Sequence, residues 1–124
     1  MMKHVMGMLV AGLLLGVAVP AAQQTTPDPK LVEAGKKLYT SQKCVQCHTI
    51  DGAGGTLTKQ YPLDGVGARL PAADIRRWLT HPAEMEAKLG KPLKLKMSMR
   101  KYALSEADLD ALVAYMLTLK EKKQ

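Results

Sequence analysis

The sequence predicts an all-α domain with a helix near each end and long loops between them. Apolar residues recur at helical spacing in residues 29–41 and again in residues 105–120. Between these segments, residues 51–67 hold five of the ten glycines and show no sustained period, as expected for a loop. No segment has a convincing strand pattern, and there is no internal repeat.

The first 22 residues have the three parts of a secretory signal peptide. Lys3 provides the charged start, residues 5–19 form an apolar run, and the small residues Ala21 and Ala22 precede a polar stretch. A membrane-spanning helix needs about 20 apolar residues, and this run is shorter and rich in glycine. We therefore expect cleavage after Ala21 or Ala22 and a periplasmic or otherwise exported protein. The alternative is an uncleaved segment, which would attach the protein to a membrane.

The mature chain of about 100 residues corresponds to one domain. The signal peptide holds one of the 18 basic residues and no acidic ones, which leaves 17 basic against 11 acidic residues and a net charge of +6. A basic surface steers an exported protein toward acidic proteins or anionic surfaces, and nucleic acid is not an expected partner. A chain of this size buries a modest share of its surface, so a large apolar cofactor at its centre would stabilise it.

The predicted elements follow a polar linker at residues 23–28. Asp28 suits the N-cap and Pro29 the first helical position of a helix that extends to Ser41. This helix leads directly to a cysteine motif at residues 44–48.

Two short helices and one long helix are predicted after the glycine-rich loop. Pro71 opens the first, which Pro82 limits, and residues 82–89 form another turn or two. Residues 91–103 are irregular, and Ser105 then caps the last helix. Its apolar stripe consists of Leu109, Leu112, Val113, Met116 and Leu117.

The motif Cys44-Val45-Gln46-Cys47-His48 has the pattern of a covalent haem-attachment site. Two thiols can each add to a vinyl group of the porphyrin, and the adjacent imidazole of His48 can reach the iron. A tetrahedral zinc site usually needs four ligands, and His81 is the only further histidine of the mature chain. A redox dithiol would accompany a βαβ pattern, which is missing. We therefore favour haem attachment over zinc, a redox dithiol or a structural disulfide.

Beyond this motif, the sequence resembles the class I cytochromes c from about Asp28 to Lys120. Gly35 and Tyr39 resemble the Gly-x-x-x-aromatic pattern of the N-terminal helix in that family, and residues 112–116 resemble its C-terminal helix. The resemblance implies that the two helices cross closely at the glycine. It also implies a cytochrome c domain over residues 29–121 around one haem c. In four-helix-bundle cytochromes c′ the motif lies near the C-terminus, so class I matches better.

The resemblance implies a methionine sulfur opposite His48 as the sixth ligand of the iron. Met97 and Met99 are the candidates, and neither is followed by the proline that is usual in the family. Tyr102 stands three residues after Met99, as in the Met-Pro-x-aromatic form, so we favour Met99. Met97 is the main alternative, and His81 or an open position are the others.

Residues 61–67 resemble the Gly-Pro-x-Leu-x-Gly segment that lies over the proximal side of the haem in this family. There a backbone carbonyl accepts the proton on the second nitrogen of the ligating histidine. Pro62 and Leu63 are therefore the predicted cofactor-binding residues, with the carbonyl at Pro62 or its neighbour. The alignment of Pro62 is displaced by one position if Leu63 and Gly65 are matched.

The predicted function is that of a monomeric single-electron carrier between redox partner proteins, and not of an enzyme. Surface lysines near the haem edge are candidates for docking such partners. They are Lys36, Lys37, Lys43, Lys59, Lys91, Lys94 and Lys96. Two alternatives stay open: a haem sensor or small haem enzyme with an open or displaceable sixth position, and a haem subunit of one dehydrogenase.

Overall fold

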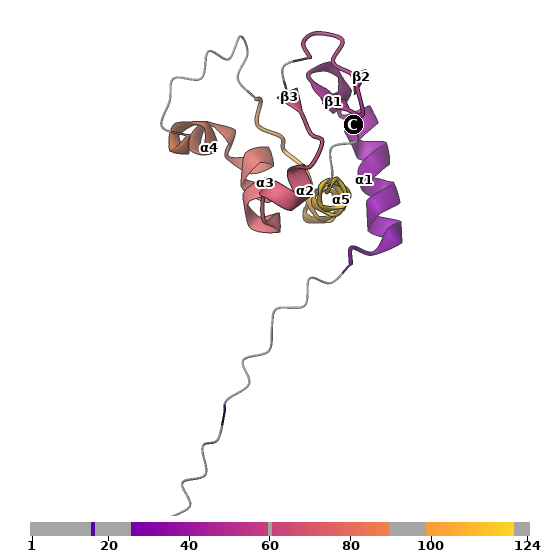
Figure 1. Ribbon diagram of the computed structural model, residues 1–124, viewed down its shortest axis with the longest axis vertical. Helices are drawn as coiled ribbons and strands as arrows, with labels where there is room; N and C mark the ends of the chain where they lie inside the picture. Colours follow the sequence, from indigo (N-terminus) through magenta and orange to yellow (C-terminus); the bar gives the residue numbers. More distant parts are fainter. Residues whose placement is uncertain (1–15, 17–25, 60, 90–98, 121–124) are drawn as a thin grey trace, which may run out of the picture.

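The computed structural model describes residues 16, 26–59, 61–89 and 99–120 of the chain (Figure 1). The predicted signal peptide, apart from Gly16, lies outside the described residues, as do Met97 and the lysines at 91, 94 and 96. Five α-helices and a 3₁₀ helix carry the described part. Their order is α1 (Pro29–Ser41), η1 (Cys44–Gln46), α2 (Val66–Arg69), α3 (Ala72–Thr80), α4 (Pro82–Lys88) and α5 (Glu106–Thr118). None of the described helices is long and apolar enough to cross a membrane.

Helix α1 begins and ends where the sequence predicts. The Asp28 side chain accepts a hydrogen bond from the Lys30 amide at 2.8 Å, and Pro29 occupies the first turn, where its missing N–H costs nothing. At the other end the Gln42 amide donates to the Leu38 carbonyl at 2.8 Å. Figure 1 shows the helix leading straight to the cysteine motif.

Helix α5 supplies much of the buried core. The Ser105 hydroxyl accepts the Asp108 amide at 3.1 Å and caps its first turn, as predicted. Four of its apolar side chains are buried in the main core cluster: Leu109, Leu112, Val113 and Met116. Tyr39 of α1 joins this cluster, and its ring meets the Tyr115 ring edge-on with centroids 5.9 Å apart.

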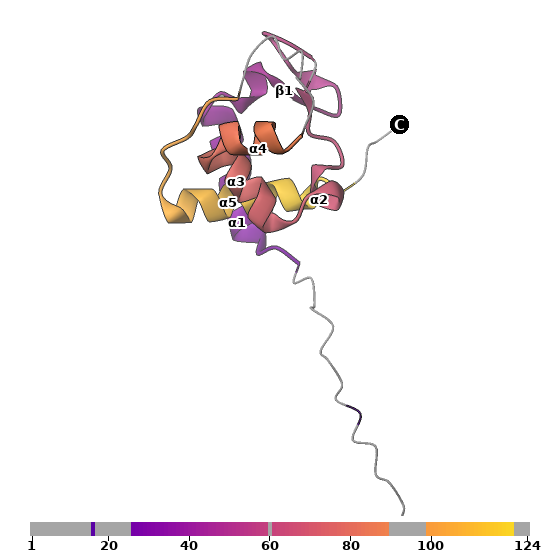
Figure 2. The ribbon, with the colours of Figure 1, turned by 90° about the vertical axis from the view of Figure 1, so that its left-hand side faces the viewer.

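Helices α1 and α5 approach each other at Gly35. A Cβ atom at this position would lie 2.0 Å from the Ala111 carbonyl oxygen, which no real side chain could tolerate. In Figure 1 α5 is seen end-on while α1 runs along the page, and Figure 2 shows α5 from the side. The backbone of α1 can therefore lie against the backbone of α5 only with glycine at residue 35.

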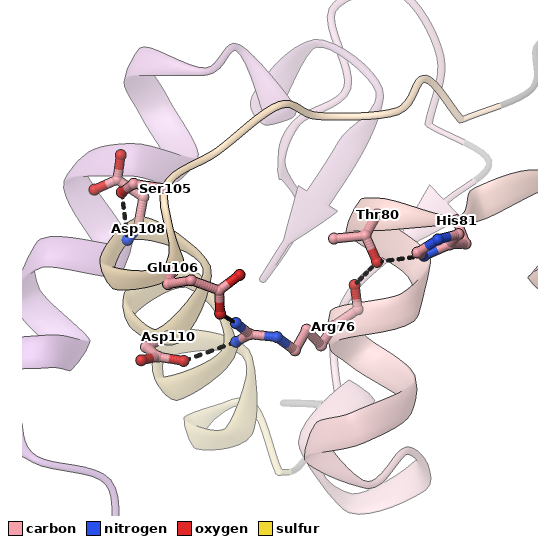
Figure 3. Close-up of polar contacts among 7 residues, drawn as sticks. All are labelled: Arg76, Thr80, His81, Ser105, Glu106, Asp108 and Asp110. Carbon is pink, nitrogen blue, oxygen red and sulfur yellow. Dashed lines mark hydrogen bonds and ion pairs between the residues drawn. The ribbon is translucent and has the colours of Figure 1, made fainter.

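Helix α3 packs on α5 through Ile75 and Leu79, which are buried in the core cluster. Arg76 of the same helix pairs with Glu106 and, at 2.7 Å, with Asp110 of α5 (Figure 3). Helix α4 follows immediately and buries Pro82 and Met85.

Three short strands lie between η1 and α2, where the sequence predicts only loop. They are β1 (His48–Ile50), β2 (Ala53–Gly54) and β3 (Tyr61–Pro62), in the order β2-β1-β3. Strand β1 pairs antiparallel with β2 and parallel with β3, with His48 opposite Tyr61. The prediction of no strand was wrong at this level of detail, because strands of two or three residues are too short to show an alternating pattern. Helix α2, which begins at the end of the predicted loop, was also missed.

Candidate functional site

The cysteine motif begins at a sharp turn that follows α1. Lys43 adopts a left-handed conformation with φ of 61°, which is uncommon for a residue other than glycine. The chain then forms the 3₁₀ helix η1, in which the Cys47 amide donates to the Cys44 carbonyl at 3.2 Å. Residues three apart in a 3₁₀ helix lie on the same face. The two free, half-buried thiols of Cys44 and Cys47 therefore lie on one side of the turn.

His48 is oriented by the first residue of β3. Its Nδ1 atom lies 2.9 Å from the Tyr61 carbonyl oxygen. Since a carbonyl can only accept, Nδ1 donates the proton, and Nε2 is left with a lone pair for a metal. Burial lowers the pKa of His48, and the hydrogen bond to Tyr61 raises it by a smaller amount. The ring is therefore held in the neutral form that ligates metals.

The hydroxyl of Tyr39 donates to the His48 carbonyl at 3.1 Å and ties the motif to α1. Burial, and to a smaller extent the nearby Cys44, Tyr115 and Asp64, raise the pKa of Tyr39 to about 12. The hydroxyl therefore stays protonated, and able to donate, at every physiological pH.

The glycine-rich loop covers the backbone of the motif. The Gly55 amide donates to the Val45 carbonyl at 2.7 Å, and the Leu57 amide donates to the Gln46 carbonyl at 2.8 Å. Gly54 has φ of +95°, and a Cβ there would lie 2.6 Å from the His48 carbonyl oxygen. Sequence patterns indicated a loop here but not this contact. The two adjacent glycines at 54 and 55 are the sequence feature that could have indicated this contact.

The segment that precedes α5 affects the electrostatics of Cys44. Burial raises the pKa of Cys44, while a hydrogen bond from the Tyr102 side chain and the charge of Arg100 act in the opposite direction. The Arg100 guanidinium also lies over the Tyr102 ring, 5.0 Å from its centroid. Sequence patterns singled out Tyr102 only by its spacing from Met99, and they did not identify Arg100.

Met99 is half-buried and packs against the core cluster. Its amide donates to Glu86 Oε1 of α4 at 3.1 Å. His81 is exposed, and its Nδ1 atom lies 2.8 Å from the Thr80 hydroxyl (Figure 3). Both His81 and Met99 line one shallow pocket at the start of α4. Met97, the alternative ligand, lies outside the described residues.

The predicted binding residues Pro62 and Leu63 directly follow the residue whose carbonyl accepts the His48 proton. The carbonyl that lies within hydrogen-bonding distance belongs to Tyr61, the residue before Pro62. Pro62 itself is exposed, and Leu63 is half-buried against the core, with its amide donating to the Thr49 carbonyl at 2.9 Å. The displaced register of the sequence resemblance accounts for the shift from Pro62 to Tyr61.

The site fits a largely apolar bound group that carries a hydrogen-bond acceptor at its edge. The Tyr61 hydroxyl is buried without a hydrogen-bond partner among the described residues, so an acceptor on a ligand would satisfy it. Within the same residues, no three His, Cys, Asp or Glu side chains are grouped to hold a bare metal ion. Two thiols on one face beside a neutral, oriented imidazole are the donor set for a covalently attached haem.

The fold and this site define a mostly helical haem-binding domain. A family model described as Cytochrome c matches residues 32–120, and the chain belongs to this family. It is therefore a haem-containing electron-transfer protein with covalently bound haem c. A search among curated proteins finds no match to the chain.

Proposed function

We propose that the chain is an exported single-electron carrier with one haem, held by Cys44 and Cys47 and ligated by His48 and Met99. The observation that carries this proposal is the hydrogen bond between His48 Nδ1 and the Tyr61 carbonyl at 2.9 Å. It leaves Nε2 of a neutral imidazole available next to Cys44, the first residue of η1, and Cys47, its C-cap. A haem attached there supplies the iron whose ferrous and ferric states carry the electron.

The residues around His48 are suited to electron transfer because they limit its movement. Tyr61 fixes the ring orientation, and Tyr39 and Gly54 both lie against the His48 carbonyl. A ligand that keeps its place in both oxidation states needs little rearrangement when the charge of the iron changes. The contact of α1 with α5 at Gly35 supports the same turn, and we take it to be the helix crossing of the family.

Met99 is the proposed sixth ligand because its segment lies beside the turn at residues 42–47, which we call the attachment turn. Tyr102 and Arg100 both interact with Cys44, and they follow Met99 by three residues and one residue. A thioether ligand raises the reduction potential relative to a second histidine. The expected partner is thus a redox protein that docks transiently on the basic surface, with the carrier itself a monomer.

Export and the domain boundaries rest on the N-terminal sequence. Residues 1–22 are proposed to be a cleaved signal peptide that sends the chain to the compartment where haem is attached. Mass spectrometry of the protein from a haem-attaching host should give an N-terminus at Ala22 or Gln23 with the mass of one haem added. An intact N-terminus would support a membrane anchor instead.

An absorption spectrum of the purified protein tests the assignment. We expect a low-spin spectrum in both oxidation states and a weak far-red charge-transfer band in the ferric form. This band should disappear in Met99→Ala, and covalent attachment should be lost in Cys44→Ser with Cys47→Ser. High-spin iron that binds carbon monoxide readily in the unmodified protein would overturn the carrier assignment and favour a sensor or enzyme.

A further inference from the structure

The segment from Met99 to Tyr102 is held by contacts from two sides before the chain enters α5. On one side lies α4, and on the other lies the turn that carries Cys44. The Tyr102 amide also donates to the Leu79 carbonyl at the end of α3, at 3.0 Å. These contacts are made by residues outside the haem-attachment motif.

On the α4 side, the half-buried Glu86 accepts the Met99 amide proton at 3.1 Å. Pro82 and Met85 are buried in the same short helix, so the position of Glu86 is fixed by packing. A carboxylate that accepts a backbone N–H makes a stronger hydrogen bond than a neutral acceptor does. Glu86 thus holds the backbone of the residue proposed as the sixth ligand.

On the attachment side, the Arg100 guanidinium donates to the Gln42 carbonyl at 3.0 Å. Gln42 is the residue that ends α1, two positions before Cys44. The same guanidinium lies over the Tyr102 ring, 5.0 Å from its centroid, and its charge acts on Cys44. Arg100 therefore connects the segment after Met99 to the backbone of the attachment turn.

We infer that Glu86 and Arg100 are positioning residues that hold Met99 as the sixth ligand, Glu86 from α4 and Arg100 from the attachment turn. The inference rests on the proposed function, in which Met99 ligates the iron. A neutral thioether is easily replaced, so its retention depends on how well the surrounding groups hold the ligand segment. Such a clamp would also compensate for the proline that is missing after Met99.

Binding of carbon monoxide to the ferrous protein measures how firmly Met99 is held. Carbon monoxide binds only to the fraction of molecules in which the sixth position is open, so its apparent dissociation constant falls as that fraction grows. Glu86→Ala and Arg100→Met should each lower this constant about two- to tenfold, the change expected from loss of one hydrogen bond. The double variant should lower it further, and the ferric charge-transfer band should weaken in parallel.

Conservative replacements and matched controls separate positioning from general destabilisation. Glu86→Gln keeps an acceptor and Arg100→Lys keeps a donor, so both should restore much of the binding behaviour of the unmodified protein. Glu84→Gln alters the neighbouring carboxylate of α4, and Arg69→Gln removes another arginine that donates to a backbone carbonyl, that of Asp64 at 2.7 Å. Both should leave the constant unchanged. Ser105→Ala should lower the unfolding temperature without changing the apparent dissociation constant for carbon monoxide.

The outcome in Met99→Ala separates failure of this inference from failure of the ligand assignment. If Met99→Ala binds carbon monoxide tightly while Glu86→Ala and Arg100→Met match the unmodified protein, Met99 is the ligand and the clamp is wrong. If Met99→Ala itself behaves as the unmodified protein does, Met99 is not the ligand and the clamp is overturned with it.

Discussion

Gly54 lies against the His48 backbone in a conformation that only glycine adopts readily. Its φ of +95° excludes ordinary side chains, and the His48 carbonyl and the Val45 side chain both approach within 3 Å of the position a Cβ would take. Lys43, at the start of the same motif, is left-handed although it is not glycine. Local strain of this kind persists where surrounding contacts hold the backbone, and here those contacts fix the attachment turn.

Replacement of Gly54 by alanine should destabilise the attachment turn. We expect the free energy of unfolding to fall by about 2 kcal/mol, because both the backbone conformation and the contact with His48 become unfavourable. Denaturant unfolding measures this loss. Gly52→Ala is the matched control, since Gly52 has φ of +77° but no neighbouring atom within 4 Å of a Cβ. An equal loss in the two variants would mean that the packing against His48 contributes nothing.

The protonated hydroxyl of Tyr39 should stabilise the folded protein, and this stabilisation should disappear at alkaline pH. Its pKa is 10.0 without perturbation and about 12 in the folded protein. Because the folded state favours the protonated hydroxyl, this stabilisation is complete below pH 10 and is lost as the pH rises toward about 12.

A comparison of Tyr39→Phe with the unmodified protein isolates this effect. At neutral pH we expect the variant to be less stable by about 1 kcal/mol, because the hydrogen bond to the His48 carbonyl is lost. The free energy of unfolding, measured between pH 7 and 12, should show this difference shrinking above pH 10. The contributions of the other titratable groups are the same in both proteins and cancel in the difference. A difference that stays constant over this range would contradict the assignment.

Among the elements, the pair α1 and α5 sets the position of the attachment turn. Gly35 permits the backbone contact, and the edge-on rings of Tyr39 and Tyr115 lie one turn further along α1, toward the motif. Gly67 makes a similar approach, since a Cβ there would lie 2.5 Å from the Leu117 carbonyl oxygen. Helix α5 is therefore in close backbone contact with α1 at one point and with α2 at another.

Gly35→Ala should separate α1 from α5 and destabilise the whole domain. With a Cβ at 2.0 Å from the Ala111 oxygen, the helices must shift apart, and we expect a loss of about 3 kcal/mol or more in the free energy of unfolding. Thermal and denaturant unfolding of the haem-containing protein give this value. Ala34→Gly provides the control at an exposed neighbouring position, where only helix propensity changes, by about 1 kcal/mol. A loss in Gly35→Ala no larger than that would exclude close contact.

At the scale of the whole molecule, basic residues lie on the same elements as the candidate site. Lys43 immediately precedes Cys44, and Arg100 contacts the attachment turn. Lys30 lies at the opposite end of α1, about 20 Å away by the rise of a 13-residue helix. This separation exceeds the Debye length of about 8 Å at physiological ionic strength, so the two ends of α1 act independently on a partner.

Electron transfer to an acidic partner should become slower as salt is added. We expect the second-order rate constant to fall about tenfold or more between low and high ionic strength. Lys43→Gln should lower the rate at low salt and reduce the salt dependence, while Lys30→Gln should change neither. Stopped-flow mixing with the reduced partner measures both, and rates independent of salt would remove the docking hypothesis.

Four of the five α-helices and the chemistry expected of the motif can be predicted from the amino-acid sequence alone. The bounds of α1, the Ser105 cap of α5 and the residues proposed to attach the haem all follow from local patterns. Caps, prolines and thiol spacing act between residues that are near in the chain, so their consequences are visible without the fold. Family membership over residues 32–120 agrees with this local reading.

The contacts between distant residues around that motif depend on the three-dimensional fold. The parallel pairing of β1 with β3 brings the Tyr61 carbonyl to His48, and the closing of residues 99–102 on α1 and α4 brings Arg100 to Gln42 and Glu86 to Met99. These contacts join residues 13 to 58 positions apart. Strands of two residues and single side-chain bonds leave no periodic trace in the sequence, because their partners are chosen by packing of the whole chain.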